Sequence, residues 1–165
     1  MATDSPILNL QELIDGNHYG THRVQNPITV YKKIRCKERM NFVDLFFKYV
    51  LFRQFSEKPE FDAIAELEIP KDAIIVRSLT YGYDSNVSPK LRTDRAIVKK
   101  IKANRSNDVS QYDMGNCECY SIFSNKYKYH VGKEQKPEKD FNNNVFKECT
   151  SGIHFFLEKY DANKY

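Results

Sequence analysis

The stretch AIAELEIP, residues 63–70, constrains the fold more than any other part of this sequence. Alanine, leucine and isoleucine occupy its odd-numbered positions, and Glu66 and Glu68 lie between them. Successive side chains of a strand point to opposite faces, so this alternation predicts a strand with one apolar and one charged face. Pro70 ends the strand, because proline cannot donate a hydrogen bond to a ladder. The chain therefore contains a sheet with one buried side.

Other stretches rich in β-branched and aromatic residues predict further strands. They are ITVYKKIR (28–35), AIIVRSLTY (73–81), RAIVKKIKA (95–103) and GIHFFL (152–157). CECYSIF and KYKYHVGK, residues 117–123 and 126–133, alternate in the same way and are separated by Ser124 and Asn125. Two residues of this kind between alternating runs predict a β-hairpin.

Two stretches predict helices. Apolar residues recur at helical spacing between Ile7 and Ile14, and Gly16 is a stop signal, so a short helix should precede the polar loop NHYGTHRVQNP. RMNFVDLFFKYVLFRQF, residues 39–55, is apolar on almost every side and too long for a typical strand, which predicts a largely buried helix.

Helices without regular alternation with the strands favour an α+β fold over a doubly wound sheet. We expect one compact domain, mainly antiparallel sheet, over residues 28–165, with an insertion at 36–60 and a helical extension at 1–27. A chain of 165 residues is long enough to fold without a metal or a disulfide.

The net charge of +4 is a mild excess, which permits an anionic partner without demanding one. The start MATDSPILNL lacks the features of a secretory signal, and no stretch approaches the ~20 apolar residues of a membrane span. We therefore expect an intracellular protein without membrane contact. Its four cysteines should be reduced thiols in that setting: Cys36, Cys117, Cys119 and Cys149.

Four pieces occur in a recognisable order: VYKKIR (30–35), AELEIPKDA (65–73), KLRTDRAIVKKI (90–101) and ECTSGIHFFLEKYDANKY (148–165). This order resembles an uncharacterised domain family of large DNA viruses, phages and some bacteria. Its members end in a stretch like CSxGIHFFLTxxxAxxY and often stand beside pentapeptide or ankyrin repeats. The similarity covers about residues 28–165, except that the stretch from Cys36 to Pro59 looks like an insertion. The resemblance implies a viral or phage-like, compact β-rich module, and it names no active site.

His154 lies in the most specific of these pieces. On a strand it shares a face with Phe156, opposite Ile153 and Phe155. We expect a hydrogen-bonded, partly buried imidazole that belongs to the scaffold and lines no cavity. The functional alternative pairs it with Cys149 as base and nucleophile across a Ser-Gly turn, which requires hydrogen-bond contact between the two.

Two binding sites have weaker support. Cys117 and Cys119 share a strand face, but a tetrahedral zinc needs two more ligands, so we expect no metal and no cofactor. In the second hairpin strand, lysines and tyrosines occupy opposite faces. Exposed tyrosines could stack bases while the lysines follow phosphates, whereas tyrosines in the core leave an ordinary solvated face. We favour the second arrangement for Lys126, Lys128, Tyr127 and Tyr129.

The aromatic insertion is the strongest candidate for a partner surface, because exposed aromatic patches mark interfaces. Its candidate contact residues are Phe42, Phe46, Phe47, Tyr49 and Phe52. A helix that merely caps a sheet face would carry the same residues. We expect a non-enzymatic structural module that acts through protein contacts, either by self-association or in a capsid-type assembly.

Two other functions stay open. G-I-x-F-F followed by a helix and a tyrosine is similar to the middle motif of ADP-ribosyltransferases, a resemblance that implies a nucleotide-handling enzyme. In that family a later strand supplies a glutamate, so this sequence would need a permuted order, with Glu66 or Glu68 in that role. The other alternative is a weak nucleic-acid-binding module.

Overall fold

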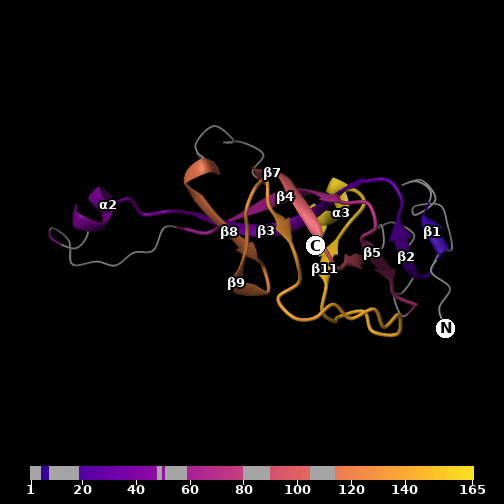
Figure 1. The fold of residues 1–165 in the computed structure, drawn as a ribbon. Helices are drawn as coiled ribbons and strands as arrows, with labels where there is room; N and C mark the ends of the chain where they lie inside the picture. The colour runs from indigo at the N-terminus through magenta and orange to yellow at the C-terminus, as the bar shows by residue number, and fades with distance from the viewer. Residues whose placement is uncertain (1–4, 8–18, 48–49, 51–58, 80–89, 105–113) are drawn as a thin grey trace.

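The computed structural model describes residues 5–7, 19–47, 50, 59–79, 90–104 and 114–165. Within these ranges the chain forms eleven strands and few helices (Figure 1). The expectation of a single domain built mostly of antiparallel sheet is confirmed, but the α+β class is wrong, because the described fold is mainly β. No helix in the described part of the chain has the length and apolarity to cross a membrane.

The larger sheet has six strands, all paired antiparallel, in the order β10-β7-β4-β3-β8-β9. Their bounds are β10 (Glu134–Gln135), β7 (Ala96–Ala103), β4 (Phe61–Ile69), β3 (Ile28–Glu38), β8 (Cys117–Ser121) and β9 (Ser124–Tyr129). β3 and β4 form its centre and pair continuously from Ile28 opposite Ile69 to Cys36 opposite Phe61. The strand predicted from AIAELEIP is therefore the second central strand of the sheet.

The smaller sheet has five strands in the order β1-β2-β5-β6-β11, of which only β1 and β2 pair in parallel. Their bounds are β1 (Ser5–Ile7), β2 (Gly20–Val24), β5 (Ile74–Arg77), β6 (Leu91–Thr93) and β11 (Ile153–Phe155). β2 corrects the expectation of a polar loop, whereas the helix expected between Ile7 and Ile14 falls almost entirely outside the described residues. Pairing with β5 outweighs the polar composition of β2, while residues 8–18 lie outside the described part.

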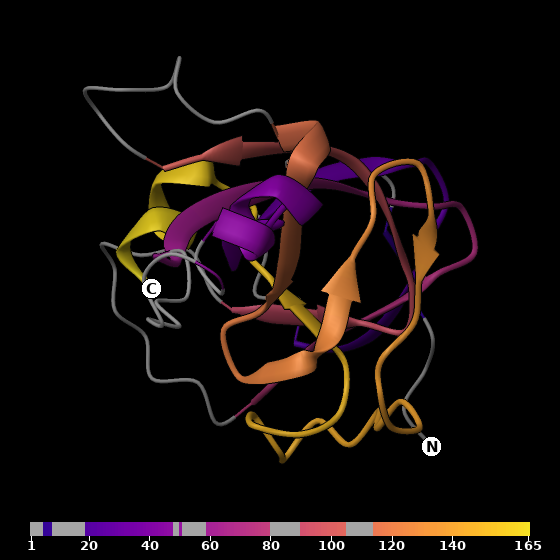
Figure 2. The same cartoon turned by 90° about the vertical axis from the view of Figure 1, so that its left-hand side faces the viewer.

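Both sheets contribute to one hydrophobic core, which the strands surround in Figure 2. The odd-numbered residues of β4 lie in this core, as their alternation predicts, and so do Ile153, Phe155 and Leu157. Phe156 points away into a small second cluster and exchanges two backbone hydrogen bonds of 2.8 Å with Tyr31. This bridge joins the end of β11 to β3 and so links the two sheets.

In the described part of the chain, three helical segments accompany the sheets: α2 (Phe42–Phe47), η2 (Met114–Asn116) and α3 (Lys159–Lys164). α2 projects from one end of the body (Figure 1), and Phe42 is 81% exposed. The expectation of a buried helix is therefore wrong for these residues. A segment that is apolar on every side indicates burial only when other elements surround it, and the insertion carries α2 away from the sheets.

The hairpin of β8 and β9 forms, but its turn is not the predicted Ser124-Asn125. Ser121 pairs with Ser124, so Ile122 and Phe123 make the turn and Ser124 begins β9. The phase of β9 is unaffected by this shift. Tyr129 lies in the core, whereas Lys126 and Lys128 are exposed.

A disulfide joins Cys36 of β3 to Cys119 of β8. The two residues stand directly opposite each other in the ladder, with their Cα atoms 4.1 Å apart. The expectation that all four cysteines are thiols is wrong for this pair, because 83 residues separate the two in sequence and only the strand register brings them together. Cys117 and Cys149 remain thiols.

Candidate functional site

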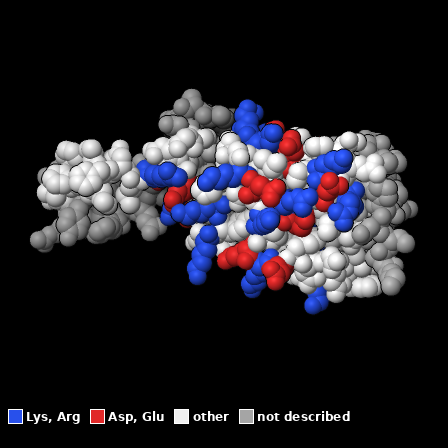
Figure 3. Space-filling model, in the orientation of Figure 1, with Lys and Arg blue, Asp and Glu red and all other residues white. Residues whose placement is uncertain are grey.

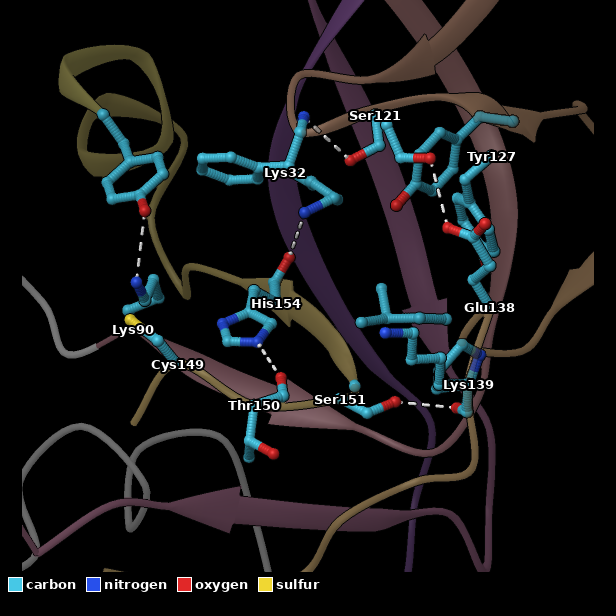
Figure 4. A pocket seen from close by; sticks show the side chains of 17 residues that line it. Lys32, Lys90, Ser121, Tyr127, Glu138, Lys139, Cys149, Thr150, Ser151 and His154 are labelled. Carbon is cyan, nitrogen blue, oxygen red and sulfur yellow. Dashed lines mark hydrogen bonds between the residues drawn. The ribbon is translucent and has the colours of Figure 1, made fainter. Parts of the chain in front are cut away.

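A pocket of about 620 Å³ lies where the β8–β9 turn, the loop after β10 and the residues around β11 meet (Figure 4). Its lining includes the side chains of His154, Cys149, Lys32 and Lys90. The expectation that His154 lines no cavity is therefore wrong. The strand assignment of His154 is right, and core residues such as Ile153 and Tyr129 also border the pocket.

Lys32 enters this pocket from the central strand β3. It is in phase with Val30 and Ile34, both of which are fully buried, and it is itself only 8% exposed. Its Nζ donates a 2.8 Å hydrogen bond to the backbone oxygen of His154. Burial, with the nearby charge of Lys90, lowers the pKa of Lys32 to about 8. An amine held in this way ionises close to neutral pH.

The sequence alone contains a signal for a buried Lys32. In ITVYKKIR, alternation places Ile28, Val30 and Ile34 on one face, and position 32 falls on that same face. A lysine in an apolar phase of a central strand indicates a buried cation, which is rare unless it is paired or functional. The resemblance in the terminal piece drew attention to His154 instead.

The His154 ring is half-buried, and its Nε2 lies 2.8 Å from the backbone oxygen of Thr150. A carbonyl can only accept, so Nε2 carries the proton and Nδ1 is left with its lone pair. Burial lowers the pKa of His154 to about 4; the bond to Thr150 opposes this shift, and the charges of Lys32, Lys90 and Arg92 add to it. The imidazole is therefore neutral at physiological pH.

Lys90 is the second buried cation of the pocket, at 9% exposure. Its Nζ donates a 3.1 Å hydrogen bond to the Tyr165 hydroxyl and lies 3.7 Å from a carboxylate oxygen of Glu148. Burial opposes its charge, but Tyr165, Cys149 and Glu148 outweigh that effect and raise the pKa of Lys90. Lys90 therefore stays protonated beside an amine that loses its proton more easily.

Arg92 holds the loop that borders the pocket. Its Nε and Nη2 donate to the backbone oxygens of Asn142 and Asn144 at 3.1 and 2.5 Å. Gly152 packs directly on this side chain, since a Cβ at that position would lie 3.0 Å from the Cβ of Arg92. The glycine of the terminal piece is thus required by a close approach, and it fixes the entry into β11.

The nucleophile–base arrangement considered for Cys149 and His154 is not formed. Both residues line the pocket, but within the described part of the chain no hydrogen bond joins the thiol to the ring, whose Nε2 is engaged by Thr150. Nor do the described residues contain a cluster of three or more His, Cys, Asp or Glu side chains able to hold a metal ion. Cationic and aromatic groups dominate the chemistry that remains.

The nucleic-acid candidates lie on the two faces of β9. Lys128 forms a 2.9 Å ion pair with Glu118. Tyr129 is 5% exposed, and Tyr127 packs against it with its hydroxyl donating to the backbone oxygen of Lys136. Burial raises the pKa of Tyr127 to about 12. These tyrosine rings are therefore packed in the structure and do not form an open stacking platform.

Three of the five interface candidates lie on α2. Phe42, Phe46 and Phe47 are 81%, 56% and 53% exposed. Val43, Leu45 and Val50 are also exposed, although no sequence argument singled them out. Tyr49 and Phe52 lie outside the described residues.

Comparison with known proteins shows the family. Residues 21–162 match the family of unknown function DUF5758, and the chain belongs to that family. Uncharacterised protein L223 of Acanthamoeba polyphaga mimivirus is 37% identical over 95% of this chain and 92% of its own length. Uncharacterised protein L227 of the same virus is 25% identical over 98% and 91%. No solved structure matches significantly. The chain is thus similar over nearly its whole length to viral proteins, as the resemblance in its sequence implies.

Proposed function

We propose that this family member is a viral interaction module that associates with a second copy of itself through α2. The observation that supports this is the exposure of Phe42, Phe46 and Phe47 on a segment that projects from the body. Large exposed apolar patches on soluble proteins mark contact sites, and aromatic side chains supply most of the buried area at such contacts. On this proposal the protein acts in the infected cell or in the virion.

The distribution of charge supports an apolar contact at this place. Figure 3 shows lysine, arginine, aspartate and glutamate scattered over the body, whereas the side chains drawn in white at the projecting end are uncharged; the side chain of Asp44, within α2, is not among the described ones. Depletion of charged side chains is typical of the buried centre of an interface.

The length of α2 also favours a partner. A helix of six residues is far below the length at which isolated helices are stable in water, and packing must supply the difference. A second α2 offers an apolar surface of the same composition, and two-fold pairing would place each phenylalanine cluster against its equivalent. The occupant we propose is therefore a second copy of this chain.

Sedimentation equilibrium over a concentration series tests the proposal. We expect a monomer–dimer equilibrium for the natural sequence and a monomer for Phe42→Ser and Phe46→Ser, with melting temperatures of the monomer unchanged because these side chains are exposed. Phe146→Ser is the matched control, since Phe146 is 70% exposed on a loop of the body. A natural protein that stays monomeric at all concentrations contradicts self-association, and so does a control variant that dissociates as readily as the α2 variants.

A further inference from the structure

We propose that the pocket beside β11 binds a small phosphorylated compound of about mononucleotide size. Its phosphate would lie between the ammonium groups of Lys32 and Lys90, and its ring would lie against Phe123 and Tyr165. This inference is independent of α2 and of self-association, because the pocket lies on the body of the protein.

The first argument is an uncompensated buried cation. The Lys32 side chain is more than nine-tenths buried and lines the pocket, yet its one hydrogen-bond partner among the described residues is the His154 carbonyl. An ammonium has three donors, so donors remain for a ligand. Burial of a charge without a counter-charge is costly, and a bound anion would remove that cost.

The second argument is the presence of two cations around one space. Lys90 lies close enough to Lys32 for its charge to lower the pKa of the Lys32 amine. Figure 4 shows both side chains near the His154 ring, which both charges also affect. A phosphate monoester carries nearly two negative charges at neutral pH, so it would compensate Lys32 and compete with Glu148 for Lys90, whereas a simple carboxylate carries one.

The third argument concerns the remainder of the ligand. Phe123 in the β8–β9 turn is 72% exposed, Tyr165 is 48% exposed, and both line the pocket with their ring centroids 6.1 Å apart. The exposed Phe123 ring at the mouth of a cationic pocket suits a flat ring, and Tyr165, which already contacts Lys90 and Phe156, borders the same place. The volume of about 620 Å³ lies within the range of small-molecule sites.

Isothermal titration calorimetry at low ionic strength with four probes tests the ligand class: inorganic phosphate, adenosine, adenosine 5′-monophosphate and citrate. We expect the monophosphate to bind more tightly than phosphate, and adenosine and citrate to bind much more weakly. Adenosine that binds as well as its monophosphate, citrate that binds as well as phosphate, or no binding by any probe at millimolar concentration would each overturn the proposal.

Variants of the natural chain locate the site. Lys32→Met and Lys90→Met should each weaken monophosphate binding by about tenfold or more, as expected for the loss of a charge-assisted contact. Lys33→Met is the matched control. Lys33 is the next residue on β3, and its side chain points to the other face, where it pairs with Asp62. Phe123→Ala should weaken binding of the monophosphate and leave that of inorganic phosphate unchanged.

Nuclear magnetic resonance supplies a readout that does not depend on folding of the lysine variants. A phosphate beside His154 favours the charged imidazole, so the titration midpoint of His154 should rise when the monophosphate is bound. Binding that leaves this midpoint unchanged, or retention of full affinity by folded Lys32→Met and Lys90→Met, would show that the phosphate lies elsewhere and contradict the assignment.

Discussion

The ammonium group of Lys32 and the backbone carbonyl of His154 are joined by a 2.8 Å hydrogen bond across 122 residues of sequence. This contact connects the central strand of the larger sheet to the edge strand β11 of the smaller one. The ionisation of a buried amine is therefore coupled to the junction between the two sheets. Changes of pH, and substitutions of the residues at this junction, test the structure.

Lys32 should make the protein more stable as the pH rises. Its pKa is about 8 in the folded chain and 10.5 in the unfolded chain, so between these values the unfolded chain binds more protons and the free energy of unfolding increases. The contribution is at most about 3 kcal/mol. Urea unfolding between pH 8 and 10.5 should show that the free energy of unfolding of the natural protein, relative to that of Lys32→Met, increases with pH. A difference that stays constant over this range would contradict the burial of the amine.

His154 should destabilise the protein on acidification. Its pKa is about 4 when folded and 6.5 when unfolded, so the unfolded chain binds more protons as the pH falls through this interval and stability is lost. Because the ring is partly exposed, we expect a loss of about 2 kcal/mol or less. His154→Gln retains a donor for Thr150 and should show a smaller loss, whereas His130→Gln, which changes an exposed side chain, should behave as the natural protein does.

The disulfide between Cys36 and Cys119 should stabilise the chain mainly by restricting its unfolded state. It closes a loop of more than 80 residues, and reduction should lower the free energy of unfolding by about 2–4 kcal/mol. The measurement is guanidinium unfolding with and without reductant, together with a thiol titration under non-reducing denaturing conditions, which should find two thiols. Cys149→Ser is the control and should change stability little, because Cys149 is exposed. Four titratable thiols in oxidised protein would contradict the pairing.

Gly152→Ala should destabilise the protein by about 1–3 kcal/mol, because the new Cβ would lie 3.0 Å from the Cβ of Arg92 and force the backbone or the arginine to move. Thermal unfolding measures the effect. Thr150→Ala in the same loop is the matched control, since its known contact is made by its backbone oxygen. Equal melting temperatures for the two variants would show that the loop absorbs the extra methyl group.

The alternation of apolar and polar residues predicts the parts of this fold in which the apolar face of a strand is also the face that the folded protein buries. The odd-numbered residues of β4, the inward Tyr129 and the inward Phe155 all follow from alternation along a half-buried strand. The local alternation alone predicts which face of its strand each of these residues occupies, without knowledge of any partner far away in the sequence.

Features that depend on residues far apart in sequence could not be predicted. β2 is a strand because β5 pairs with it, and Cys36 meets Cys119 only through the register of β3 and β8. α2 has the apolar composition of a buried helix but lies on a segment that projects from the body. Composition alone could not show whether its apolar side chains pack in the core or are exposed as a contact surface. The pocket could not be predicted either, because Lys32 on β3 meets His154 and Lys90 only through the packing of segments far apart in sequence.

The ladder between β3 and β4 is continuous up to Cys36 opposite Phe61, so the chain departs and returns at adjacent points of two bonded strands. Between Glu38, where the pairing of β3 with β8 ends, and Phe61, the chain is in topological terms an enlarged hairpin loop. Such a loop can be lengthened, shortened or exchanged at little cost in chain entropy and without altering any registration in the sheet. The architecture thus allows the segment between Glu38 and Phe61 to change in length and sequence while the paired strands of the body keep their register.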